Sequence, residues 1–300
     1  MKKIAAFIKE NKQFTIFTVL ALIVVFVAVF ADVIAPMDPT AATLSDAFMA
    51  PSAAHPWGTD QLGRDVMSRV IYGTRISLSA SLVLVAAIFL IGTILGSIAG
   101  FCGGAVDAII MRISDMMISF PGMVLAIAVA GLMGASITNA IIALMVVSWT
   151  KYARLARSLV LKIRHSDFIE AAEVTGTKPC NIIMRYLIPN ALPTLVITAA
   201  TDIGSMILEL AGLSFLGFGA QPPASEWGLM LNEGRAYLLQ CPWLMIFPGL
   251  AICITVIVFN LLGDSLRDVL DPRQKRSAAA KKAPDSRDVL KEAALEGEAI

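Results

Sequence analysis

Long apolar runs are the feature of this sequence that most limits how it can fold. A helix needs about 20 apolar residues to cross a bilayer, and it satisfies its own backbone hydrogen bonds there. Only 16% of the residues are charged, against about 25% in soluble globular chains. We therefore predict an all-α integral membrane protein with about six transmembrane helices, at residues 14–31, 78–101, 116–132, 137–150, 191–208 and 244–262.

The basic residues are distributed unevenly between the connecting segments. If the N-terminus is cytoplasmic, the inside segments hold 20 of the 24 Lys and Arg residues. The outside segments hold the other four, which are Arg64, Arg69, Arg75 and Arg235. Because Lys and Arg accumulate in cytoplasmic loops, both termini are predicted to be cytoplasmic.

This topology divides the chain into five segments. We expect a cytoplasmic N-terminus at 1–13, a first transmembrane anchor at 14–36, an external loop at 37–75, a transmembrane domain at 76–263 with a cytoplasmic hairpin at 151–190, and a cytoplasmic tail at 264–300. The first apolar run exceeds the 7–15-residue core of a secretory signal, which favours an uncleaved anchor. The pattern from residue 60 onward predicts a surface helix leading into the second span. The composition from residue 274 onward predicts disorder or a weakly formed, solvent-exposed helix.

Side chains that carry catalytic chemistry are sparse. No GxxxxGK[ST] segment is present, so the chain is not expected to bind ATP through a P-loop. His55 and His165 lie on opposite sides of the membrane in this topology and are interpreted as surface histidines. The four cysteines lack CxxC spacing and are interpreted as small apolar residues rather than a disulfide or zinc framework: Cys102, Cys180, Cys241 and Cys253. We predict no catalytic residue, no metal site, no cofactor and no nucleic-acid partner for this chain.

Three glycines in the second apolar run, Gly92, Gly96 and Gly100, are spaced four residues apart. Residues at this spacing share one face of a helix. Small residues in such a stripe let two membrane helices approach closely. The stripe therefore predicts tight helix packing.

Two acidic residues, Asp202 and Glu209, fall in or beside the fifth apolar run. Seven residues separate them, so they lie about 20° apart around a helix. Carboxylates are costly in a bilayer and usually face a cavity or a partner. One hypothesis is that both line a translocation path and attract a cation in passing, because no His or Cys is near enough to bind it tightly. The alternative is that Glu209 is solvated near the outer interface while Asp202 bonds a neighbouring helix.

A polar interruption, EAAEVTGTKPCNIIMRYLIPNALP at 170–193, predicts a helical hairpin on the cytoplasmic side. Asp167 with Glu170 three residues later has the spacing of a capping box and predicts a short helix over 168–175. Gly176 follows where a left-handed residue ends a helix. Ala171 and Ala172 would be exposed and leave a shallow surface for a partner, although a solvated connecting loop is the alternative reading.

A second short helix is predicted to follow the glycine. Thr177 is its candidate N-cap, and Pro179 is tolerated in its first turn. Pro189 and Pro193 are expected to end this helix before the next span.

The order Glu170-Ala171-Ala172, then Gly176, then Ile188-Pro189 resembles the EAA motif of the membrane subunits of bacterial ABC importers. An Ile-Pro stands here where Leu-Pro is often seen. The resemblance implies that the short helix docks into a cleft on an ATP-binding subunit. Glu170 would then meet a basic group, the two alanines would give close contact, and Gly176 would make the turn.

Four longer segments resemble the C-type permeases of dipeptide, oligopeptide and nickel importers: WGTDQLGRDVMSRVIYGTRISL, DMMISFPG, LSFLGFGAQPPASEWGLML and FPGLAICITVIVFNLLGDSLRDVLDP. The segment TDIGSMILELAGLSFLG is most similar to nickel-type permeases. The resemblance implies a type I ABC importer permease fold in a bacterial inner membrane. It also implies a second permease subunit, two ATP-binding subunits that hold ATP and Mg, and an extracytoplasmic solute-binding protein. The cargo would be nickel, a metal complex or short peptides.

Two other classes of protein remain as alternatives. An ion-coupled secondary transporter acting alone needs a relay of membrane acids and repeated broken helices, whereas this chain shows no internal repeat and only two deep acids. A scaffold that anchors a cytosolic enzyme would have no use for Asp202 and Glu209 within a span.

Overall fold

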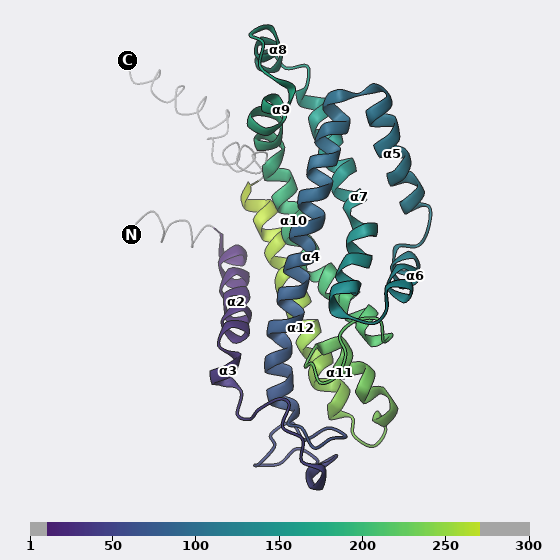
Figure 1. Ribbon diagram of the computed structural model, residues 1–300. Coiled ribbons are helices and arrows are strands. Elements are labelled where there is room, and N and C mark those ends of the chain that lie inside the picture. The colour runs from purple at the N-terminus through teal and green to yellow at the C-terminus, as the bar shows by residue number, and fades with distance from the viewer. Residues whose placement is uncertain (1–10, 271–300) are drawn as a thin grey trace, which may run out of the picture.

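The computed structural model describes residues 11–270, and these residues form a bundle of helices without a β-strand (Figure 1). The prediction of an all-α chain is confirmed. Residues 1–10 and 271–300, which include most of the predicted N-terminal segment and tail, lie outside the described part. The helices are α2 (Lys12–Val29), α3 (Ala31–Ile34), η1 (Leu44–Asp46), α4 (Val66–Cys102), α5 (Gly104–Ile118), α6 (Gly122–Met133), α7 (Ile137–Ile163), α8 (Asp167–Val174), α9 (Pro179–Ile182), η2 (Ile183–Leu187), α10 (Ile188–Phe215), α11 (Trp227–Gly234), η3 (Arg235–Tyr237) and α12 (Trp243–Leu270).

The long helices α4, α7, α10 and α12 run along the length of the bundle (Figure 1). Helix α4 packs most extensively against α7, and α10 packs most extensively against α12. Helix α2 lies against α12 and α4, while α5 and α6 flank α7. Helices α8 and α9 stand at one end of the bundle, and α11 with the loop before α4 forms the other end (Figure 1). We call these the α8 end and the α11 end.

Four helices of the described part are long and apolar enough to cross a membrane: α2, α4, the continuous helical segment Pro179–Phe215, and α12. A fifth crossing exists if α5 and α6 are counted together. Helix α7 spans 27 residues but is not among the four. Its apolar run ends at Thr150, and Lys151, Arg154 and Arg157 follow within two turns. The count of about six therefore exceeds the four or five candidates.

The predicted third span, 116–132, is wrong as a single straight helix. Helix α5 ends at Ile118, α6 begins at Gly122, and the two helices meet at a bend of 92°. Pro121 is the N-cap of α6 and cannot donate the backbone hydrogen bond that a continuous helix needs. The run is apolar as predicted, but an apolar composition does not reveal where the helical chain changes direction.

The glycine stripe of α4 meets α7. A Cβ on Gly92 would lie 2.5 Å from the carbonyl oxygen of Trp149, and one on Gly96 would lie 2.1 Å from that of Ala153. Gly100 faces Val160, which also belongs to α7. The two helices thus approach each other closely enough that backbone atoms of α7 occupy the places where side chains of α4 would stand. This contact holds α7, which leads to the α8 hairpin, against the 37-residue helix α4.

Two ion pairs tie α5 to the basic half of α7. Arg154 pairs with Asp115, and Arg157 pairs with Asp107 through two contacts. The basic residues that follow the apolar run of α7 are therefore partly neutralised by acids of α5. Lys151, one turn earlier, instead reaches α10.

Candidate functional site

The hairpin at the α8 end begins with a cap that differs from the prediction. Ser166 is the N-cap of α8, and Asp167 is the first helical residue, so Asp167 is not the cap. No side-chain hydrogen bond caps the helix. Asp167 and Glu170 both lie in the first turn, where negative charge interacts favourably with the helix dipole. The capping-box spacing therefore located the helix but not its starting residue.

Helix α8 ends in a tight turn at Gly176. The Gly176 amide donates to the carbonyl of Glu173, and the Thr177 amide donates to that of Ala172, each at 3.0 Å. Gly176 has a φ of 75°, which glycine adopts without the steric cost that a side chain would add. This pair of hydrogen bonds is a Schellman motif. The turn reverses the chain and starts the second arm of the hairpin.

Only part of the predicted docking surface faces outward. Ala171 is exposed, but Ala172 is buried, so the expectation that both alanines are exposed is wrong. Ala172 and Ile169 pack against a small cluster formed by Val160 of α7 and by Ile182 and Leu187 of the second arm. Sequence spacing places Ala172 and Ile169 on one face, but the cluster that covers them comes from other helices.

The outward face of α8 is partly apolar. Phe168 and Val174 are exposed by 46% and 87%, and Glu170 and Ala171 lie between them in the sequence. Phe168 and Val174 were not among the predicted docking residues, although both are apolar residues in a mostly polar segment.

The second arm runs without interruption into the long helix α10. Lys178 rather than Thr177 is the N-cap of α9, and Pro179 is its first helical residue. Pro189 and Pro193 do not end a helix, because both lie in α10. A π-helical turn, η2, precedes these prolines. Its hydrogen bonds join residues five apart, which changes the backbone hydrogen bonding near two residues that have no amide hydrogen to donate. Ile188 and Pro189 therefore connect the hairpin to α10 as one helical body.

A polar cavity of about 240 Å³ lies between α7 and α10. The Lys151 Nζ atom is 2.5 Å from Asp202 Oδ1, and the Tyr152 hydroxyl donates to Asp202 Oδ2 at 2.9 Å. Asp202 is almost fully buried, while Glu209 is partly exposed. Asp202 thus bonds a neighbouring helix and lines a cavity together with Glu209. The cavity is lined by Ile88, Ser148, Thr150, Lys151, Asp202, Ser205, Met206 and Glu209.

The hydroxyl residues of α10 extend this polar surface toward the α8 end. Thr194, Thr198, Thr201 and Ser205 recur every three or four residues and share the helix face that carries Glu209. The three threonines line a second cavity of about 570 Å³, together with Arg267 of α12. This stripe was missed in the sequence, although its spacing is legible there. One face of α10 therefore connects two cavities.

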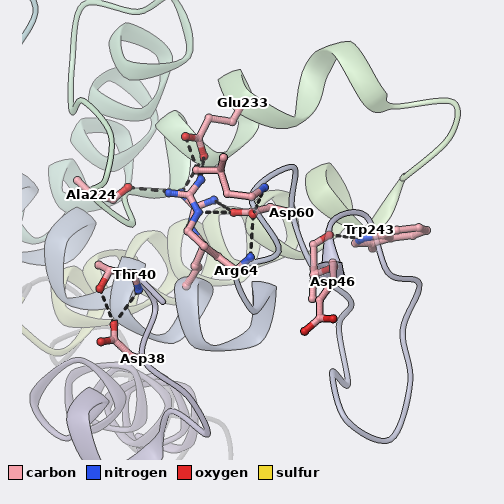
Figure 2. Close-up of polar contacts among 11 residues, drawn as sticks. Asp38, Thr40, Asp46, Asp60, Arg64, Ala224, Glu233 and Trp243 are labelled. Atoms are coloured by element: carbon pink, nitrogen blue, oxygen red, sulfur yellow. Dashed lines mark hydrogen bonds and ion pairs between the residues drawn. The ribbon is translucent and has the colours of Figure 1, made fainter. Parts of the chain in front are cut away.

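At the α11 end, charged side chains are buried in a network (Figure 2). Arg64 Nε lies 2.7 Å from Asp60 Oδ2, and Arg69 Nη1 lies 2.5 Å from the same oxygen. Both guanidinium groups also reach Glu233 of α11, at 3.2 and 2.7 Å. Each arginine side chain is only 2% exposed. The network fastens the loop before α4 and the start of α4 to α11.

The predicted surface helix from residue 60 and the surface position of His55 are both wrong. Helix α4 begins at Val66, and its first turns are buried beneath the loop and α11. His55 is buried, with its Nδ1 atom 3.1 Å from Asp65, the N-cap of α4. His165 is exposed as predicted. Charges predicted to be solvated are buried here because they pair with one another across the sequence.

Glu226 caps α11 from a buried position and accepts hydrogen bonds from the amides of Gly228 and Leu229. Burial raises the pKa of the Glu226 carboxyl above its usual value, and these hydrogen bonds act in the opposite direction. The hydroxyl of Ser77 in α4 also donates to Glu226. The cap therefore joins α11 to α4 near the buried network.

Within residues 11–270, no group of three or more His, Cys, Asp or Glu side chains could hold a metal ion. The four cysteines of the sequence are free. The acids of the polar cavity are thus a pair, Asp202 and Glu209, beside one lysine.

Apolar helices long enough to cross a bilayer, a polar face along one of them and a projecting hairpin define a multi-pass membrane protein. The sequence profile of the family "Binding-protein-dependent transport system inner membrane component" matches residues 92–276, and the chain belongs to this family. The prediction of a multi-pass inner-membrane permease is confirmed. The chain is a transport subunit rather than an enzyme, and the ion-coupled secondary transporter is set aside.

Curated relatives and a solved structure agree with this family. The dipeptide transport system permease protein DppC of Alkalihalophilus pseudofirmus is 40% identical over 268 residues, which cover 89% of this chain and 88% of that protein. The nickel transport system permease protein NikC of Escherichia coli strain K12 is 41% identical over 237 residues, covering 79% and 86%. An inward-facing structure of the MetNI methionine ABC transporter matches with a TM-score of 0.55 at 21% identity, over 68% of this chain and 97% of that one. This last match confirms the type I permease fold.

Proposed function

We propose that this chain is one of two permease subunits of an ABC importer that moves nickel or short peptides into the cell. The observation that carries the proposal is the rigid connection between the α8 hairpin and the polar cavity. Helix α7 leads into the hairpin, α10 leads out of it, and the cavity lies between these same two helices. Movement imposed on the hairpin would therefore reach the cavity directly.

In this proposal the α8 end and both termini are cytoplasmic, and α8 docks on an ATP-binding subunit. Glu170 meets a basic group of that subunit. Ala171 contacts the same subunit closely, and the exposed Phe168 and Val174 flank it on α8. Ala172 serves the inner packing of the hairpin instead of the docking surface. The ATP-binding subunits hold ATP and Mg, and a solute-binding protein delivers the cargo to the α11 end.

The translocation path is proposed to follow the polar face of α10. Glu209 and Asp202 supply negative charge in one cavity, and the threonines supply hydroxyl groups in the other. Metal ions and the amino ends of peptides are both positively charged, which fits relatives named for dipeptide and nickel transport. A pair of carboxylates without His or Cys holds a metal weakly, and weak contact suits a conduit.

The test is cargo-stimulated ATP hydrolysis by the complete importer in proteoliposomes, with nickel and dipeptides compared at the outer face. Glu170→Lys is expected to abolish the stimulation, because a lysine would repel the basic group on the ATP-binding subunit. Glu173→Lys makes the same charge change on the same helix, away from the centre of its outward face, and serves as the control. Normal stimulation in Glu170→Lys would overturn the docking role, and the cargo that stimulates identifies the substrate.

A further inference from the structure

We propose that Lys151 is a displaceable counter-ion that latches α7 to α10 at Asp202, and that positively charged cargo opens the latch by taking its place. The inference rests on the proposed function, in which cargo passes along α10. It adds a specificity-determining residue, Lys151, and a route from cargo to the hairpin.

The two partners of the ion pair differ in their freedom to move. The Asp202 side chain is 5% exposed, and its Oδ2 atom is held by the fully buried Tyr152. The Lys151 side chain is 59% exposed and bonds only the other oxygen, Oδ1. The carboxylate is therefore fixed, whereas the ammonium group can rotate away without a change in the backbone. A buried anion held by a mobile cation is the arrangement that an exchange requires.

The charges that line the cavity favour such an exchange. Two carboxylates, Asp202 and Glu209, face one ammonium group, and the other lining residues are uncharged. Glu209 forms no ion pair within residues 11–270. Arg154 and Arg157, the next basic residues of α7, are already paired with acids of α5. A cation that enters the cavity thus meets net negative charge and competes with Lys151 alone.

The latch lies between the two helices that carry the hairpin. Lys151 precedes the end of α7 at Ile163 by 12 residues, which is about 18 Å of helix. Asp202 follows the start of the continuous helical segment at Pro179 by 23 residues, about 35 Å of helix. The contact therefore joins the two helical segments that enter and leave the α8 hairpin. Opening it removes the ion pair between α7 and α10 and leaves only the Tyr152 hydrogen bond, also from α7, on Asp202. The weakened contact lets the two helices shift relative to each other, which would report the presence of cargo to the ATP-binding subunits.

The test compares basal and cargo-stimulated ATP hydrolysis of the reconstituted importer. Lys151→Met removes the latch and is expected to raise basal hydrolysis by at least about fivefold, the lower end of typical allosteric coupling, while the further stimulation by cargo is lost. Lys151→Arg keeps the positive charge and should retain low basal hydrolysis. Lys162→Met removes an exposed charge from the same helix and should behave as the wild type. Wild-type basal and stimulated rates in Lys151→Met would overturn the proposal.

Two further measurements separate the possible failures. If Lys151→Met does not assemble, the double variant Lys151→Met with Asp202→Asn is measured, because it leaves no buried carboxylate at position 202 without its cation. Raised basal hydrolysis in the double variant supports the latch, and wild-type hydrolysis overturns it. If the wild-type importer shows no stimulation by nickel or dipeptides, the proposed function has failed. If it shows stimulation and Lys151→Met retains it, only the latch has failed.

Discussion

The close approach of α4 to α7 leads to a quantitative prediction for Gly96→Ala. The added Cβ would lie 2.1 Å from the carbonyl oxygen of Ala153 and 2.8 Å from its Cα, and neither backbone atom can rotate away. Ordinary contact begins at 3.4 Å, so the two helices must separate by about 1.3 Å at this point. The separation also loosens the contacts of Gly92 and Gly100 with α7.

Overpacking of this kind costs about 1–3 kcal/mol. Alanine is preferred over glycine in a helix by about 0.5–1 kcal/mol, which offsets part of the cost. We expect a net loss of about 1–2 kcal/mol and a fall in Tm of about 2–8 °C. The assay is thermal unfolding of the purified importer, followed by circular dichroism.

Gly249→Ala is the matched control, because Gly249 lies inside α12 and a Cβ there would meet only a leucine side-chain atom at 4.0 Å. It gains the helix preference without the clash, so its Tm should equal or exceed that of the wild type. A Tm for Gly96→Ala as high as that of the control would refute the reasoning about close packing.

Four further predictions concern the hairpin, the buried network, the cavity and the energy source. Gly176→Val places a β-branched residue at a φ of 75°, at a cost of about 1–3 kcal/mol. Cargo-stimulated ATP hydrolysis should therefore fall while membrane insertion, measured by fractionation, persists. Normal stimulation would contradict this prediction. Arg69→Met breaks a buried network and should destabilise by about 3–5 kcal/mol in thermal unfolding. Arg154→Met removes an exposed pair with Asp115 that is worth less than about 1 kcal/mol, and equal losses in the two variants would disprove this ranking. Glu209→Gln should slow uptake of radioactive nickel by cells at matched expression, because one of two cavity carboxylates is lost, and unchanged uptake would remove Glu209 from the path. The purified chain alone should hydrolyse no ATP, and hydrolysis that survives removal of contaminating ATPases would refute this.

The hairpin shows how far local sequence reasoning reaches. The glycine at 176 and the Glu-Ala-Ala segment before it were sufficient to place a helix, a left-handed turn and a second arm, because these depend on neighbouring residues. The same reasoning placed Ala172 outward. Its burial depends on Ile182 and Leu187, which return to it from the second arm only after the chain has folded back.

The charged residues outside the spans gave the least reliable predictions. Composition treats Arg64, Arg69 and His55 as solvated, because an isolated charge avoids the interior. All three are buried, since Asp60, Asp65 and Glu233 compensate them. Glu233 lies 164 residues beyond Arg69, and no periodic pattern links the two.

By itself, the sequence determined the all-helical membrane class, the helix face shared by the three glycines and the position of the hairpin, because these depend on composition and on spacing along one helix. Only the tertiary structure decided what meets each face: α7 at the glycines, Lys151 and Tyr152 at Asp202, and the bend of 92° between α5 and α6. The physical reason is that spacing along a helix places side chains on a face, whereas the burial and the partners of that face depend on how distant helices pack against it.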